Sequence, residues 1–256
     1  MTQVVILAGG LGTRLREETA VRPKPMVEIG DRPILWHIMK IFDHYGHRSF
    51  VIPVGYKGHL IKEFFLGYRD RYADFTVELG SAALSRHSPS PEAWSVTVVE
   101  TGTTTQTGGR LKRLEPFLQE RFFVTYGDGV ANVDLGALEA FHLAHGRLAT
   151  VTAVHPSARF GAISLDGDRV TSFTEKSQAD AGWINGGFFV FERRVLDYIR
   201  DDETSLEREP LERLVADDQL RAFRHEGFWE PMDTQRDLDH LNEQWASGQA
   251  PWRVWR

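Results

Sequence analysis

The 256-residue chain is predicted to fold as one α/β domain, spanning residues 1–256, in which helices flank a mostly parallel central sheet. Two observations predict this class. Short apolar runs recur along the chain, and segments of helical periodicity separate several of them. Strands and helices that alternate in this way form parallel sheets covered on both faces. No linker-like change in composition divides the chain, which favours one domain over two.

The first apolar run extends from Val4 to Ala8 and ends at Gly9-Gly10. It does not alternate between polar and apolar residues, so it is expected to be buried on both faces in the middle of the sheet. Further strands are predicted over residues 49–54, 94–100, 121–127, 149–154 and 186–192, and helices over residues 33–46, 135–146 and 204–218.

Three segments do not follow this alternation. Residues 161–176 are predicted to form a β-hairpin, with the turn at residues 166–168, near the edge of the sheet. Residues 80–93 combine small, polar and proline residues, which indicates a mobile loop. Residues 240–256 contain three tryptophans, and the sequence leaves open whether these dock on the chain or contact another subunit.

Composition excludes several classes of function. The chain has 30 Lys and Arg against 36 Asp and Glu, a net charge of −6, so no electrostatic attraction to nucleic acid or to an anionic membrane is expected. It has no cysteine, which excludes disulfides, thiolate metal sites and a cysteine nucleophile. The first residues lack the basic segment of a secretory signal, and no apolar stretch approaches the length of a membrane span, so a cytoplasmic protein is expected.

The glycine-rich loop after the first strand is the strongest candidate for a ligand site, because ligands of such sheets bind at the carboxyl ends of the strands. It reads Gly9-Gly10-Leu11-Gly12-Thr13-Arg14, and Lys24 follows between two prolines. Glycines let backbone N–H groups turn toward a phosphate, and the two cations would stabilise a departing polyphosphate. The spacing matches neither a Walker loop nor a dinucleotide fingerprint. A strand-to-helix turn with solvated basic residues is the alternative interpretation.

This loop and the segment around Lys24 resemble the signature G-G-x-G-T-R-L…P-K-P of the sugar nucleotidyltransferases, which join a sugar 1-phosphate to a nucleoside triphosphate. Segments similar to the cytidylyltransferases of that family extend from Val4 to the last residues: KPMVEIGDRPILWHIMK, TGGRLKR, YGDGV, RFGA, NGGFF, EPL, GFWEPMDT and APWRVW. Residues 80–93 are the main stretch that matches poorly. The resemblance implies a Rossmann-like nucleotidyltransferase fold with a small β-hairpin sugar-binding region.

The resemblance also implies a reaction. CTP and α-D-glucose 1-phosphate would give CDP-glucose and pyrophosphate, with Mg²⁺ as cofactor, by direct in-line attack of the sugar phosphate on the α-phosphorus. No general base is needed, because the second pKa of a phosphate monoester is about 6. A homo-oligomer such as the hexamers of the family is expected, without nucleic-acid or membrane partners. A thymidylyl- or uridylyltransferase for the same sugar phosphate and a non-catalytic sensor of nucleotide sugars are the alternatives.

By the same resemblance, the site residues divide into four sets. The catalytic residues are Arg14 and Lys24, and the metal ligands are Asp128 and Asp233. The nucleotide-binding residues are Leu7, Ala8, Gly9, Gly10, Gly12, Thr13, Thr105, Gly109, Arg110 and Asp128. The residues that bind the sugar phosphate are Glu175, Lys176, Asn185, Gly186 and Gly187, with Ser177 in the place where the family usually has a proline.

Taken alone, these residue types leave other interpretations open. Asp128 follows a predicted strand, where a carboxylate can hold Mg²⁺ against phosphate, but Gly-Asp-Gly is also a common turn. Asp233 would by itself indicate the N-cap of a helix. Arg110 offers only donors, in a planar fork that suits O2 and N3 of cytosine, and a surface position at a helix start is the alternative.

Two histidine patterns are not assigned to a metal. Glu139, His142 and His145 have the spacing of a metal-binding helix, but a solvated helix face is the preferred interpretation. His44 and His47 lie near a predicted helix end, where the helix dipole favours a cation.

Overall fold

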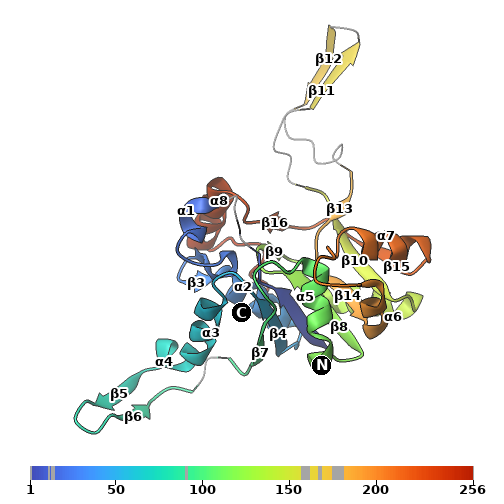
Figure 1. Ribbon diagram of the computed structural model, residues 1–256. Coiled ribbons are helices and arrows are strands. Elements are labelled where there is room, and N and C mark those ends of the chain that lie inside the picture. The colour runs from blue at the N-terminus through green and yellow to red at the C-terminus, as the bar shows by residue number, and fades with distance from the viewer. Residues whose placement is uncertain are drawn as a thin grey trace.

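An eight-stranded sheet forms the centre of the computed structural model, which describes residues 2–10, 12, 15–89, 92–156, 162–166, 169–174 and 182–255 (Figure 1). In spatial order the strands are β7 (Ser95–Glu100), β4 (Ser49–Val54), β1 (Gln3–Leu7), β8 (Arg121–Tyr126), β14 (Phe189–Glu192) and β10 (Ala149–Val154), with β13 (Ile184–Asn185) and β15 (Leu220–His225) both paired to β10.

The predicted α/β class is confirmed, but the sheet is mixed. β1 is parallel to β4 and β8, β4 is parallel to β7, and β10 is parallel to β15. β14 lies between β8 and β10 and runs antiparallel to both. Strands β1, β4, β7, β8 and β10 therefore all end at one edge of the sheet, and β14 begins at that edge.

Helices cover both faces because the side chains of β1 alternate between two apolar layers. Val4 and Ile6 pack into one layer with α2 (Ile34–His44) and α8 (Gln235–Ala246). Val5 and Leu7 pack into the other with α5 (Thr107–Arg113) and α7 (Glu209–Ala216). All four side chains are buried, so the prediction of a central strand buried on both faces is confirmed.

The remaining elements are shorter or lie outside the main sheet. The helices are α1 (Arg16–Thr19), α3 (Gly58–Leu66), α4 (Tyr68–Tyr72) and α6 (Leu135–His145), with 3-10 turns at η1 (Lys24–Met26), η2 (Glu115–Phe117) and η4 (Arg193–Tyr198). Antiparallel pairs join β2 (Glu28–Ile29) to β3 (Arg32–Pro33), β5 (Phe75–Glu78) to β6 (Ala83–Arg86), β9 (Gly129–Ala131) to β16 (Trp229–Pro231), and β11 (Ala162–Asp166) to β12 (Arg169–Thr174). The longest helix of the described chain is α8, with 12 residues, and no described helix is long and apolar enough to cross a bilayer.

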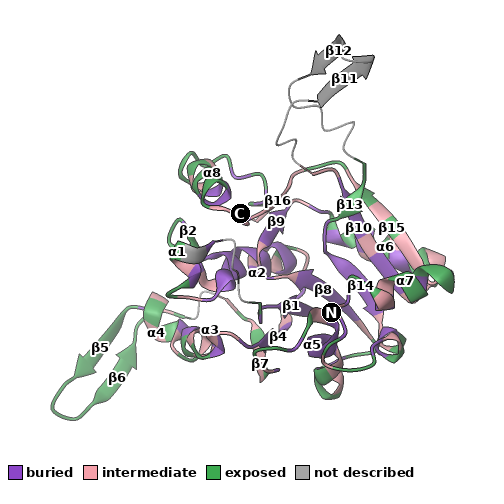
Figure 2. Cartoon of the chain, turned by 45° about the horizontal axis from the view of Figure 1, so that its top comes forward, coloured by how far each residue is buried: buried purple, intermediate pink, exposed green. Residues whose placement is uncertain are grey.

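Four predicted segments differ in detail from the structure. The helix predicted over 204–218 begins only at Glu209, because Pro210 fits the first turn of a helix and not its interior. The strand predicted over 186–192 begins at Phe189, because Gly187 and Phe188 adopt positive φ angles of 74° and 45°. Residues 80–93 are not a loop throughout, since they contain β6, and Figure 2 shows that the β5–β6 pair is exposed along its length. The predicted hairpin forms as β11 and β12, but as a sheet of its own; its turn residues 167–168 lie outside the described residues.

The C-terminal tryptophans dock on the chain itself. Trp252 is fully buried, and its Nε1 donates to Nδ1 of His37 at 3.3 Å. Burial lowers the pKa of His37 to about 4, so the ring is neutral at pH 7. Nε2 of this ring can then donate to the Ile29 carbonyl at 3.0 Å while Nδ1 accepts from the indole. Phe228 and Trp245 stack against Trp252. Of the two interpretations left open by the sequence, docking on the chain itself therefore explains the tryptophans.

Replacing Trp252 by alanine should lower the free energy of unfolding by about 3–5 kcal/mol, because a large buried aromatic leaves a cavity behind. Urea unfolding followed by far-UV circular dichroism measures the loss. Phe117→Ala is the matched control, since that side chain is 47% exposed, and it should cost less than about 1 kcal/mol. Equal losses in the two variants would contradict docking of the tail.

Candidate functional site

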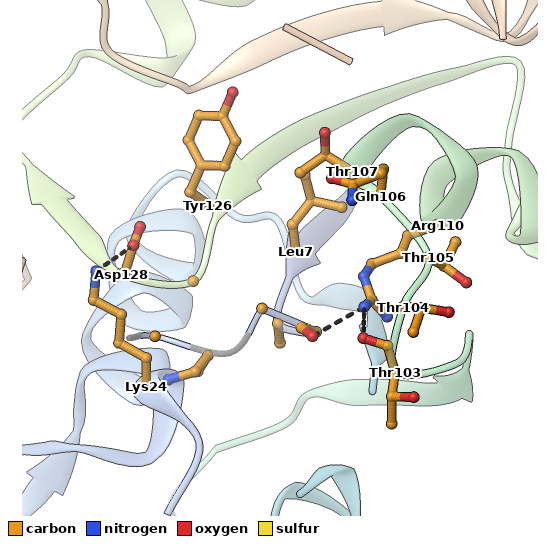
Figure 3. Close-up of a pocket in the computed structure, with 16 residues that line it drawn as sticks. Leu7, Lys24, Thr103, Thr104, Thr105, Gln106, Thr107, Arg110, Tyr126 and Asp128 are labelled. Atoms are coloured by element: carbon orange, nitrogen blue, oxygen red, sulfur yellow. Dashed lines mark hydrogen bonds and ion pairs between the residues drawn. The ribbon is translucent and has the colours of Figure 1, made fainter. Parts of the chain in front are cut away.

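A cavity of about 640 Å³ opens at the edge of the sheet where β1, β7 and β8 end (Figure 3). The loops that follow these strands form its walls, together with η1. Nine lining residues were predicted as site residues: Leu7, Ala8, Gly9, Gly10, Gly12, Lys24, Thr105, Arg110 and Asp128. Seven were missed: Pro25, Thr103, Thr104, Gln106, Thr107, Tyr126 and Gly127. Two features of the sequence could have indicated them: the threonine-rich run before α5, and the tyrosine two residues before Asp128.

Lys24 lies between the two carboxylates that are predicted to bind a metal. Its Nζ donates to Oδ2 of Asp128 and to Oδ1 of Asp233, both at 2.7 Å. Burial acts to lower the pKa of Lys24, whose side chain is 9% exposed, but the adjacent carboxylates, Asp128 foremost, outweigh burial and raise it. Lys24 is therefore a fixed cation at neutral pH.

Strand pairing brings the two carboxylates together. β9 and β16 pair antiparallel, with Gly129 opposite Pro231. Just beyond this pair, the N–H of Met232 donates to the carbonyl of Asp128 at 2.8 Å. The side chains of Asp128 and Asp233 consequently meet at the Lys24 ammonium, although they are far apart in the sequence.

The interpretation of Asp233 as the N-cap of a helix is wrong. Thr234 is the N-cap of α8, and its Oγ1 accepts from the N–H of Asp237 at 3.3 Å. Asp237 returns the contact, because its Oδ2 accepts from the N–H of Thr234 at 2.8 Å. This capping box satisfies the helix start without the carboxylate of Asp233, which binds Lys24 instead.

The two carboxylates fit a divalent metal. Each directs an oxygen to the same cation, the Lys24 ammonium, so the site is already built to hold positive charge. Within the described part of the chain, no group of three or more Asp, Glu, His or Cys side chains is arranged to hold a metal. Mg²⁺ is commonly held by one or two carboxylates together with substrate phosphates, so a pair of aspartates is the expected donor set for it.

Arg110 lies against Gly9 and is only 4% exposed, so the interpretation as a surface residue is wrong. Its Nη1 donates to Oγ1 of Thr101 at 2.8 Å, to the carbonyl of Gly102 at 2.7 Å and to that of Val54 at 3.3 Å. Its Nη2 donates to the carbonyl of Gly9 at 2.9 Å. A Cβ on residue 9 would lie 2.2 Å from Cζ of this arginine, so a side chain there would displace the guanidinium from its present position.

Gly109 was predicted to contact the nucleotide, and the structure places it against another part of the chain. A Cβ there would lie 2.5 Å from Cα of Asp202. The missing side chain therefore lets α5 pack closely on the segment before α7. The predicted site residues Thr13, Arg14, Glu175 and Lys176, and Ser177 with them, lie outside the described residues.

The predicted sugar-binding residues Asn185, Gly186 and Gly187 lie beside the cavity and not in its lining, at the end of β13 and just after it. Nδ2 of Asn185 donates to the hydroxyl of Tyr126 at 3.2 Å, which connects it to a cavity wall. Gly186 packs tightly, because a Cβ there would lie 2.6 Å from Cγ1 of Val154. Gly187 has a φ of 74°, a conformation that favours glycine.

His142 and Glu139, from the first histidine pattern, both form hydrogen bonds within the protein. His142 is buried and lies within hydrogen-bonding distance of Thr150 and Glu192, so the interpretation as a solvated helix face is wrong for this residue. Burial lowers its pKa. Glu139 accepts a hydrogen bond from the hydroxyl of Thr2.

Comparisons with known proteins show which family and fold this chain shares. Residues 3–246 match the family model described as nucleotidyl transferase. The chain is 50% identical over 255 residues to a glucose-1-phosphate cytidylyltransferase of Salmonella typhi, with 99% of each chain covered. It is 42% identical over 255 residues to a probable glucose-1-phosphate cytidylyltransferase of Bacillus subtilis (strain 168), covering 99% of this chain and 100% of that one. The crystal structure of HddC from Yersinia pseudotuberculosis has the same fold, with a TM-score of 0.70 over 96% of this chain and 100% of that chain, at 23% identity.

Lys24→Met should remove a pH-dependent part of the stability. Because the pKa of Lys24 is raised in the folded protein above its ordinary value of 10.5, the charged lysine stabilises the fold fully below that pH. The contribution is lost as the pH rises through the folded pKa. The difference in free energy of unfolding between wild type and variant, measured by urea unfolding, should therefore be constant near neutral pH and shrink above pH 10.5.

Lys62→Met is the control for this measurement, because Lys62 forms an exposed ion pair with Glu100 and exposed pairs contribute little. A wild-type advantage over Lys24→Met that stayed constant across the alkaline range would contradict a buried ion pair at Lys24.

Proposed function

Because this chain belongs to the nucleotidyl transferase family, we propose that it transfers the cytidylyl group of CTP to α-D-glucose 1-phosphate, which gives CDP-glucose and pyrophosphate. The observation that carries the proposal is the 50% identity, over 99% of both chains, to a glucose-1-phosphate cytidylyltransferase. The cavity supports it, because a volume of about 640 Å³ suits a small-molecule ligand.

The two sides of the cavity suit the two ends of a nucleotide. Lys24 and Asp128 lie on one side, where a phosphate chain and a cation would bind, and Arg110 lies on the other among threonines 103–105 (Figure 3). Hydroxyl and guanidinium groups suit a base with several hydrogen-bonding atoms. Gly9, Gly10 and Gly12 also line the cavity.

The reaction brings two anions together. An oxygen of glucose 1-phosphate attacks the α-phosphorus of CTP, a new P–O bond forms, and the bond to pyrophosphate breaks. The protein must supply charge neutralisation and alignment, and no general base, because the attacking phosphate is largely dianionic with a second pKa of about 6. We assign Lys24 to the α-phosphate, Arg14 to the pyrophosphate and Lys176 to the sugar phosphate.

Members of the family generally use a divalent metal, and in this chain we assign Mg²⁺ to Asp128 and Asp233. When bound, the ion would offset negative charge on the α-phosphate. Lys24 holds one oxygen of each carboxylate in place before substrate arrives. The carboxylate of Glu175 and the amide of Asn185, beside Gly186 and Gly187, are assigned to the hydroxyls of glucose.

The proposal also covers the domain organisation, the oligomeric state and the location of the protein. A single nucleotidyltransferase domain over residues 1–256 is supported by a family match that spans residues 3–246. A homo-oligomer such as a hexamer and a cytoplasmic location are the further parts of the proposal.

Asp128→Asn and Asp233→Asn should each lower kcat/KM by at least about 100-fold, because Lewis-acid stabilisation is worth several kcal/mol and each 1.4 kcal/mol is about tenfold. Pyrophosphate release with Mg²⁺, CTP and glucose 1-phosphate measures the loss. Thr234→Ala is the neighbouring control, which removes the α8 cap at a cost of about 1 kcal/mol in stability and should leave kcat/KM nearly unchanged. Near-normal turnover in Asp233→Asn with a lowered Tm would contradict the metal assignment.

The wild type should prefer CTP to UTP and dTTP, and Arg110→Ala should reduce the preference for CTP over UTP by about tenfold. A guanidinium suits O2 and N3 of cytosine but opposes the N3–H of uracil. Since Nη1 and Nη2 of Arg110 donate to protein acceptors, the base would have to take the place of some of these acceptors. Loss of its bonds to backbone carbonyls should lower kcat/KM for both triphosphates alike, so the ratio of the two kcat/KM values isolates base recognition.

Arg113→Ala, on the same helix but exposed and paired with Asp202, should leave that ratio unchanged. An unchanged ratio in Arg110→Ala would limit this residue to holding the loops. A wild-type preference for UTP or dTTP would overturn the cytidylyltransferase proposal.

A further inference from the structure

One carboxylate connects the nucleotide side of the cavity with the region assigned to the sugar. Glu207 is exposed and precedes α7. Its Oε1 accepts from the hydroxyl of Tyr126 at 2.8 Å, and its Oε2 accepts from the hydroxyls of Thr107 at 2.6 Å and Ser205 at 2.7 Å. Tyr126, at the end of β8, and Thr107, at the start of α5, both line the cavity (Figure 3). A single side chain therefore joins two of its walls.

The donors and acceptors in this network have a fixed direction. An ionised carboxylate only accepts, so each hydroxyl donates its one hydrogen to Glu207. The oxygen of Tyr126 is then an acceptor, and Nδ2 of Asn185 donates to it at 3.2 Å. The oxygen of Thr107 likewise accepts from the backbone N–H of Leu206 at 2.9 Å.

The amide of Asn185 is fixed at both ends by this arrangement. Its Nδ2 faces Tyr126, and its Oδ1 accepts from the backbone N–H of Gly187 at 2.9 Å. An amide carries two N–H donors and two oxygen lone pairs, so one donor and one lone pair remain for a ligand. A donor beside an acceptor complements a sugar hydroxyl, which both accepts and donates.

We propose that Glu207 is a positioning residue for the sugar: it orients the Tyr126 hydroxyl, which in turn fixes the Asn185 amide that meets a glucose hydroxyl. The inference rests on the proposed function, which assigns Asn185 to the sugar.

The nucleotide side should depend less on Glu207 than the sugar side does. Thr107 keeps its bond to Leu206 without the carboxylate, and Arg110 holds the nucleotide wall through separate hydrogen bonds. On the sugar side, Tyr126 is the side chain that links Glu207 to Asn185. Loss of Glu207 should therefore act on the sugar phosphate in particular.

Glu207→Gln tests this division. Glutamine has one acceptor oxygen in place of two, so it cannot accept from all three hydroxyls. The KM for glucose 1-phosphate should rise about tenfold, the loss of one hydrogen bond, while the KM for CTP and kcat stay within about twofold. Glu203→Gln, an exposed carboxylate on the same segment, is the control and should change neither KM.

Tyr126→Phe removes the hydroxyl that links Glu207 to Asn185. It should raise the KM for glucose 1-phosphate to a similar extent. The double variant should show no further rise, because both changes remove one pathway. Melting temperatures establish that each variant is folded, and Tyr126→Phe decides the question if Glu207→Gln does not fold. Equal rises in both KM values, a fall in kcat alone, or no change would overturn the proposal.

The wild type in the same assay separates this inference from the proposed function. If the wild type prefers another sugar 1-phosphate, the proposed substrate is wrong, and the KM comparison is made with the preferred one. If the wild type turns over none, the Kd of glucose 1-phosphate, measured by calorimetry, replaces the KM, and an equal Kd in wild type and Glu207→Gln overturns the inference.

Discussion

The geometry of the cavity depends on one guanidinium that is buried against Gly9 and the neighbouring strand ends. Arg110 donates to groups at the ends of three neighbouring parallel strands: the Gly9 carbonyl after β1, the Val54 carbonyl of β4, and Thr101 and Gly102 after β7. Its partners are uncharged, so burial lowers its pKa, and several hydrogen bonds offset the cost of removing the charge from water. The strand ends are thereby held at fixed spacing, which is what a site formed by their loops requires.

A second buried cation serves the opposite side of the cavity in a different way. Lys24 has two carboxylate partners in place of carbonyls, and removing the lysine alone would leave these carboxylates without their cation. Its effect is also geometric, because it holds Asp128 and Asp233 in one arrangement. The cation on the Arg110 side of the cavity thus has uncharged partners, and the cation on the Lys24 side has carboxylate partners.

Much of the fold and part of the site follow from the sequence, for local reasons. The apolar run from Val4 to Ala8 and the glycines after it lie in one short segment. The buried strand and the loop that follows it can therefore be predicted from neighbouring residues alone. The meeting of Asp128 with Asp233 is not, because it depends on the pairing of β9 with β16, which lie far apart in the chain. The burial of Arg110 depends on its hydrogen bonds to residues of other loops. The spacing of apolar residues in its own helix does not predict these bonds. Glu207 belongs to no recognised motif, and only the folded chain brings three hydroxyls to it.

The docked tail has a consequence for how the protein is made. The apolar layer against α2 contains both Val4 and Trp252, residues from opposite ends of the chain. A ribosome adds about 5–20 residues per second, so roughly 10–40 s separate the synthesis of His37 from that of the indole that covers it. Through that interval the apolar face of α2 lacks its final cover and is open to association with other nascent chains. We therefore expect the yield of folded protein in a cell to depend on the speed of translation and on the supply of chaperones, as well as on the stability of the finished fold.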